Sequence, residues 1–270
     1  MRFDAFTAGP AGGELVLLLH GFPENASCWR DALATLGDAG FRAVAPSQRG
    51  YSAGAYPVGV DAYRVSELCV DVLAMASALG AKRFHVIGHD WGGTVAWALA
   101  GDHPDAVISL CAVSTPHTAA LREALRGTRQ RLQMAYIPIL RLPRVAESLF
   151  EAGGGITAET LLMATGLSKA HAHNDVAALR KLGPTGALNW YRALGTEPAH
   201  AKPVEVPVLY IWGDRDPVFT REAAELTAEY CTGDYHLLEL ERGSHWIPEQ
   251  HWDDVADVVL EHLTAAPAGA

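Results

Sequence analysis

The 270-residue sequence predicts an α/β fold, with a mostly parallel, twisted sheet flanked by helices. Short apolar runs alternate with longer stretches of helical spacing, which is typical of parallel strands joined by helices. The alternation stops at residue 115, and only helical stretches follow until about residue 203. We therefore expect a core of residues 1–114 and 204–270, with a helical cap, residues 115–203, inserted over the C-terminal ends of the strands. Open α/β sheets bind their ligands at that edge.

The core elements follow in order along the chain. The first strand run, residues 15–19, is apolar at every position, which suits a strand covered on both faces. Six strands are predicted in all: 15–19, 41–45, 83–87, 107–113, 206–212 and 235–240. The intervening helices are predicted over residues 29–36, 64–79, 94–100 and 252–263. Within the cap, helical stretches are expected over residues 121–136, 158–165 and 187–194.

The composition indicates which kinds of binding partner and which cellular compartment to expect. The formal net charge of −10, without a basic patch, argues against nucleic acid and against an anionic membrane surface. No apolar run approaches the roughly 20 residues of a membrane span, and the first residues show no signal-peptide pattern. The four cysteines form no CxxC pair, which suits a reducing compartment. A cytoplasmic protein without a membrane partner is predicted, and a homodimer is left open.

The segment Gly88-His89-Asp90-Trp91-Gly92-Gly93 has the pattern of a nucleophile elbow, with aspartate in the place of the usual serine. A strand is predicted before it and a helix after it. An aspartate there would attack a carbon that bears a leaving group and would form an ester. The alternative is that Asp90 only caps the helix that follows.

Three more motifs each follow a predicted strand. In His20-Gly21-Phe22-Pro23, the Phe22 N–H is expected to form an oxyanion hole with the N–H of Trp91; the alternative is a plain turn. The order nucleophile, acid, histidine is that of a hydrolase triad, and it selects His245 in Arg242-Gly243-Ser244-His245.

In Trp212-Gly213-Asp214-Arg215-Asp216-Pro217, either Asp216 or Asp214 could be the carboxylate that orients this histidine, and the family resemblance described below favours Asp216; the alternative is a plain turn. No metal site is predicted, since His171 and His173, two residues apart, do not share a helix face. No cofactor is expected either.

These motifs resemble those of the α/β-hydrolase family, and within it the epoxide hydrolases, over nearly the whole chain. The resemblance implies an α/β-hydrolase fold and two cap tyrosines that donate a proton to the epoxide oxygen. Tyr191, in Asn189-Trp190-Tyr191-Arg192, matches one of them, and Tyr136 matches the other. The tyrosines could instead be packed cap aromatics. Pro138, two residues after Tyr136, could end or kink a cap helix and so displace it.

The resemblance also sets the expected substrate, an apolar epoxide that water converts to a vicinal diol. Haloalkane dehalogenases share the elbow aspartate and tryptophan, so a dehalogenase or another hydrolase using Asp90 is the alternative; Phe22 stands where they usually have asparagine. A small-molecule binding protein is the non-enzymatic alternative. The residues expected to line the substrate pocket lie beside the motifs: His20, Pro23, His89, Trp190 and Trp246.

Overall fold

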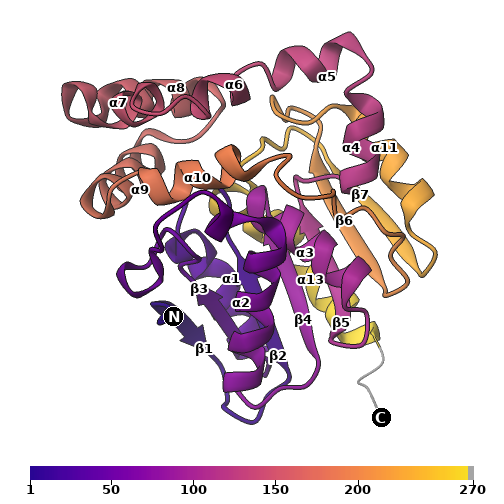
Figure 1. The fold of residues 1–270 in the computed structure, drawn as a ribbon. Helices are drawn as coiled ribbons and strands as arrows, with labels where there is room; N and C mark the ends of the chain where they lie inside the picture. The colour runs from indigo at the N-terminus through magenta and orange to yellow at the C-terminus, as the bar shows by residue number, and fades with distance from the viewer. Residues whose placement is uncertain (267–270) are drawn as a thin grey trace.

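The fold is built on one seven-stranded sheet, seen in a computed structural model that describes residues 1–266 (Figure 1). The strand order is β1-β3-β2-β4-β5-β6-β7, and every pair is parallel except β1 with β3. The strands are β1 Ala5–Ala8, β2 Leu15–Leu19, β3 Arg42–Pro46, β4 Phe84–His89, β5 Val107–Val113, β6 Val208–Gly213 and β7 Tyr235–Leu240. The predicted fold class is therefore confirmed.

Helices cover both faces of this sheet, which explains why its central strands are apolar throughout. Helices α1 (Arg30–Asp38) and α13 (Trp252–Ala265) pack on one face, against alternate strand residues such as Leu18 and Ile211. Helices α2 (Val65–Ala78) and α3 (Trp91–Asp102) pack on the other face, as Figure 1 shows. Two short helices belong to the C-terminal part of the core: α11 (Arg221–Leu226) lies between β6 and β7 in the chain, and α12 (Ile247–Gln250) follows β7.

The segment between β5 and β6 contains seven α-helices. They are α4 Thr118–Ala124, α5 Thr128–Gln133, α6 Ile137–Leu140, α7 Val145–Glu151, α8 Ile156–Ala164, α9 Lys169–Leu182 and α10 Thr185–Ala193. Helices α6, α7 and α8 form the layer farthest from the sheet, and α10 lies between them and the core (Figure 1). Within the described residues, no helix is long and apolar enough to span a bilayer.

Several local predictions differ from the structure, and the short helices α6, α7, α11 and α12 were not predicted. Strand β1 was not predicted, because its residues are mostly exposed and carry no apolar pattern. The single helix expected over 121–136 is instead α4 and α5, separated at Leu125–Gly127. Helix α9 was missed, since its polar and charged sequence lacks a strong apolar stripe. The last residues of the predicted core, 267–270, lie outside the described residues.

Candidate active site

Asp90 occupies the tight turn between β4 and α3, with φ 49° and ψ −117°. The neighbouring glycines are required by close contacts, because a Cβ on Gly88 would lie 2.3 Å from the Gly92 carbonyl oxygen. A Cβ on Gly92 would lie 2.1 Å from the carbonyl oxygen of Leu19. Although Asp90 stands at the N-cap position of α3, its carboxylate makes no capping hydrogen bond. The turn therefore leaves this carboxylate free to face the end of the sheet.

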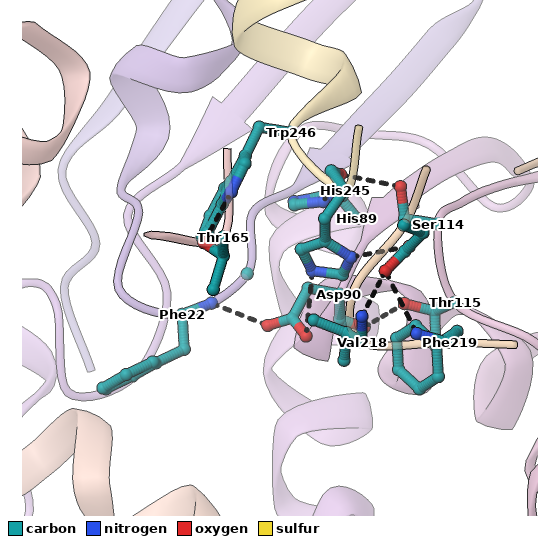
Figure 2. A network of polar contacts seen from close by, with 12 residues as sticks. Phe22, His89, Asp90, Ser114, Thr115, Thr165, Val218, Phe219, His245 and Trp246 are labelled. Carbon is teal, nitrogen blue, oxygen red and sulfur yellow. Dashed lines mark hydrogen bonds and ion pairs between the residues drawn. The ribbon is translucent and has the colours of Figure 1, made fainter. Parts of the chain in front are cut away.

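The loop after β2 brings a backbone donor to this carboxylate. The Phe22 N–H donates a hydrogen bond of 2.9 Å to Asp90 Oδ1 (Figure 2). The N–H of Trp91, the other predicted oxyanion donor, makes no hydrogen bond to Asp90 among the described residues. The Trp91 ring instead packs edge to face on Tyr191, with ring centroids 5.1 Å apart. The Phe22 N–H thus already donates to the Asp90 carboxylate, whereas the Trp91 N–H belongs to the first residue of α3.

His245 lies between two carboxylates. Its Nδ1 is 2.9 Å from Asp216 Oδ2, and its Nε2 is 3.7 Å from Asp90 Oδ2. The other oxygen of Asp216 accepts backbone N–H groups of Val218 and Phe219, at 2.6 and 3.0 Å (Figure 2). Asp214, the alternative partner, is exposed to solvent. The loops after β6 and β7 therefore bring Asp216, and not Asp214, to His245.

The charges at this site hold one another ionised. Burial alone would lower the pKa of His245, but Asp216 and Asp90 outweigh it and raise that pKa to about 10. Burial would likewise raise the pKa of Asp90, but His245 and the Phe22 N–H bring it below its ordinary value. The site at rest is therefore a carboxylate beside an imidazolium.

A cavity of about 300 Å³ opens beside the Asp90 carboxylate. Its wall is mostly apolar, and its polar lining residues include Asp90, His245, Thr165 and two tyrosines. The lining residues are Phe22, Asp90, Tyr136, Ile139, Leu140, Leu149, Phe150, Ala158, Leu161, Leu162, Thr165, Tyr191, Val218, His245 and Trp246. Both predicted cap tyrosines and His245 thus border one space with Asp90.

The two tyrosines reach this space from different cap segments. Tyr191 is a buried residue of α10 that packs edge to face on Phe22, at 5.1 Å between ring centroids. Tyr136 immediately precedes α6, in which Pro138 occupies the first turn, where a missing N–H is harmless. Burial and the nearby Asp90 carboxylate raise the pKa of both hydroxyls. Both tyrosines are therefore protonated donors at neutral pH.

Of the five residues predicted to line the pocket, only Trp246 does so. His20 is turned into the core, where its Nε2 accepts the Gln48 N–H at 3.1 Å. Pro23 follows Phe22 through a cis peptide and is buried away from the cavity. The prediction failed for these residues because adjacency in sequence does not determine which way a side chain points.

His89 and Trp190 are also displaced from the predicted lining. Side chains alternate in direction along the end of β4, so His89 points behind Asp90. Its Nδ1 is 2.7 Å from the carboxylate of Glu24, and its Nε2 is 2.8 Å from the His245 carbonyl oxygen. Trp190 donates its indole N–H to the Arg49 carbonyl oxygen at 2.9 Å and lines a second, separate cavity. His89 and Trp190 therefore brace the site from outside the cavity.

Sequence reasoning also missed two polar residues that support the elbow and the histidine. After β5, Ser114 donates to the His245 carbonyl oxygen and Thr115 to the Asp90 carbonyl oxygen, each at 2.8 Å (Figure 2). The only sequence signal for them is their place directly after a strand. The apolar cap residues that form most of the cavity wall carry no distinguishing signal at all.

With the geometry established, comparison with known proteins identifies the family. The family model described as the alpha/beta hydrolase fold matches residues 14–251. The chain belongs to the α/β-hydrolase family. The prediction that this protein is a hydrolase enzyme is thereby confirmed.

Relatives of this hydrolase match it along most of their own length. AB hydrolase superfamily protein YfhM of Bacillus subtilis is 35% identical, covering 95% of this chain and 92% of its own. Epoxide hydrolase A of Mycobacterium tuberculosis is 29% identical, covering 98% and 94%. The crystal structure of Epoxide Hydrolase A from Mycobacterium thermoresistibile superposes with a TM-score of 0.84 at 27% identity, covering 98% and 96%.

Proposed function

We propose that this hydrolase opens an apolar epoxide to a vicinal diol, through an ester formed on Asp90. The observation that carries the proposal is the meeting of three features at one apolar cavity: a carboxylate that does not cap its helix, a histidine paired with Asp216, and two tyrosines from the cap. The similarity to proteins named epoxide hydrolases supports the same reading.

In the first step, Asp90 Oδ2 attacks a carbon of the epoxide ring and the C–O bond breaks. The oxygen that leaves is an alkoxide, and an unpartnered alkoxide is costly in an apolar cavity. Tyr136 and Tyr191 stabilise this alkoxide, because both donate hydrogen bonds to its oxygen and one of them supplies the proton. The imidazolium of His245 then returns a proton to the tyrosinate, which leaves His245 neutral.

Formation of the ester also prepares the second step. Because esterification removes the Asp90 charge, the pKa of His245 falls and the ring becomes a base. Oriented by Asp216, His245 takes a proton from water, and the hydroxide attacks the ester carbonyl of Asp90. The Phe22 N–H, with that of Trp91, stabilises the resulting oxyanion. The intermediate expels the diol oxygen, which takes the carboxylic proton of Asp90, and the resting ion pair is restored.

A single turnover in ¹⁸O-labelled water tests this proposal. With enzyme in excess over an aryl glycidyl ether, the first diol should carry unlabelled oxygen from Asp90, and label should remain in the enzyme. A first product that carries the label would mean that water attacks the ring directly.

The variant His245→Gln tests the second step separately. It should still form the ester but hydrolyse it about 10²–10⁴-fold more slowly, which is the usual contribution of a general base. Intact-protein mass spectrometry should then show the mass of enzyme plus substrate. Wild-type release of chloride or bromide from haloalkanes faster than epoxide opening would favour the dehalogenase alternative, and no turnover of either class would favour a binding protein.

A further inference from the structure

We infer that the outer layer of the cap docks on an anionic lipid surface, from which the apolar cavity receives its substrate. We define the cap surface as the exposed side chains of residues 128–145 on α5, α6 and the start of α7, together with those of α8. The inference is that this surface binds lipid. It rests on the proposed function only for the claim that the molecule entering the cavity is an epoxide.

The first observation is the concentration of exposed apolar side chains on these helices. Leu132 is 70% exposed, Ile156 64% and Leu161 53%. Ile139, Leu142, Val145 and Met163 are each between 43% and 50% exposed. Most of the large apolar side chains that are exposed in residues 1–266 therefore belong to the cap surface. Apolar side chains gathered in one place usually mark an interaction site.

The second observation is the charge of residues 128–145, since the only charged residue of α8, Glu159, is 3.0 Å from His173. Residues 128–145 contain four arginines and no aspartate or glutamate, although the chain has a formal net charge of −10. All four are exposed: Arg129, Arg131, Arg141 and Arg144. None of the four guanidinium groups forms an ion pair within residues 1–266. The prediction of no membrane partner rested on the net charge, which averages over this local excess of positive charge.

The third observation connects this surface to the cavity. Ile139 on α6 and Leu161 on α8 line the cavity that reaches Asp90, and both are about half exposed. The cavity wall therefore shares residues with the surface that carries the apolar and basic side chains. An apolar molecule dissolved in lipid could enter past these shared residues without crossing water.

The mixture of side chains favours lipid over a second copy of the chain. Apolar side chains with arginines on one face are typical of elements that lie in the interface of a bilayer. Two copies that met through this surface would bring eight unpaired guanidinium groups together, and like charges facing each other are unfavourable. Anionic headgroups would instead neutralise these groups while the leucines and isoleucines enter the acyl boundary.

Vesicle flotation with the purified full chain tests the inference. The wild type should float with vesicles of about one third phosphatidylglycerol in phosphatidylcholine, but not with phosphatidylcholine alone. Binding should weaken strongly near 1 M salt, where the Debye length is only about 3 Å. The triple variant R129Q/R131Q/R144Q should bind roughly a hundredfold more weakly, since each basic residue near such a surface contributes about fivefold.

A charge-matched control separates the cap from the overall charge. R2Q/R30Q/K82Q removes the same charge from exposed positions of the core and should bind like the wild type. Equal losses in the two triple variants, or no flotation of the wild type, would overturn the inference. A second result would also overturn it: light scattering shows a dimer, the substitutions Leu132→Gln and Leu142→Gln abolish that dimer, and the wild type does not bind lipid. Because flotation needs no turnover, its result is independent of whether the protein opens epoxides.

Discussion

Gly21 offers a direct test of how closely the Phe22 N–H and the Asp90 carboxylate, the proposed oxyanion donor and nucleophile, are fitted together. A Cβ on Gly21 would lie 2.4 Å from Asp90 Cβ and 2.7 Å from Asp90 Oδ1. Ordinary contacts to a Cβ begin at 3.4 Å, so Gly21→Ala must separate the two loops by about 1 Å. A displacement of this size breaks the 2.9 Å hydrogen bond from Phe22 to Asp90.

The expected effect is a loss of about 10²-fold in the rate of ester formation, because a misplacement of about 1 Å is sufficient for that. Stopped-flow tryptophan fluorescence with an excess of epoxide measures this rate, and circular dichroism shows whether the variant is folded. Gly12→Ala is the matched control, since a Cβ there meets nothing within 4 Å. A folded Gly21→Ala protein that forms the ester within about threefold of the wild-type rate would refute the reasoning.

Three further predictions follow from the site and the core. Tyr191→Phe should slow ring opening about 10-fold or more, and the double variant with Tyr136→Phe about 10²–10⁴-fold, measured as single-turnover rates; equal rates in wild type and double variant would exclude proton donation by the pair. His245 has a folded pKa of about 10 against an ordinary 6.5, so its contribution to stability is complete below about pH 6.5 and is lost as the pH rises through about 10. NMR titration should show that Asp90→Asn lowers this pKa, and an unchanged value would argue against the ion pair. Leu18→Ala, at a fully buried position of β2, should cost about 2–5 kcal/mol in urea unfolding; a loss below about 1 kcal/mol would contradict the packing described.

The order of motifs along the chain was enough to predict which polar groups meet. Asp90, Asp216 and His245 each follow a parallel strand, and parallel strands end at one edge of the sheet. Local sequence could therefore predict their proximity without any knowledge of the packing. The same reasoning failed for His20 and His89, since a turn or a strand end sends neighbouring side chains in opposite directions.

The sequence by itself determined the fold class, the elbow and the chain order of its partners, because these depend on short-range patterns of apolar residues, glycines and turns. Only the tertiary structure decided that Tyr136 faces Asp90 and that cap apolar residues form the cavity wall. It also decided that the arginines of the cap share a layer with exposed leucines and isoleucines. These features depend on how short helices, far apart in sequence, pack on one another, and periodicity within a single helix does not specify its neighbour.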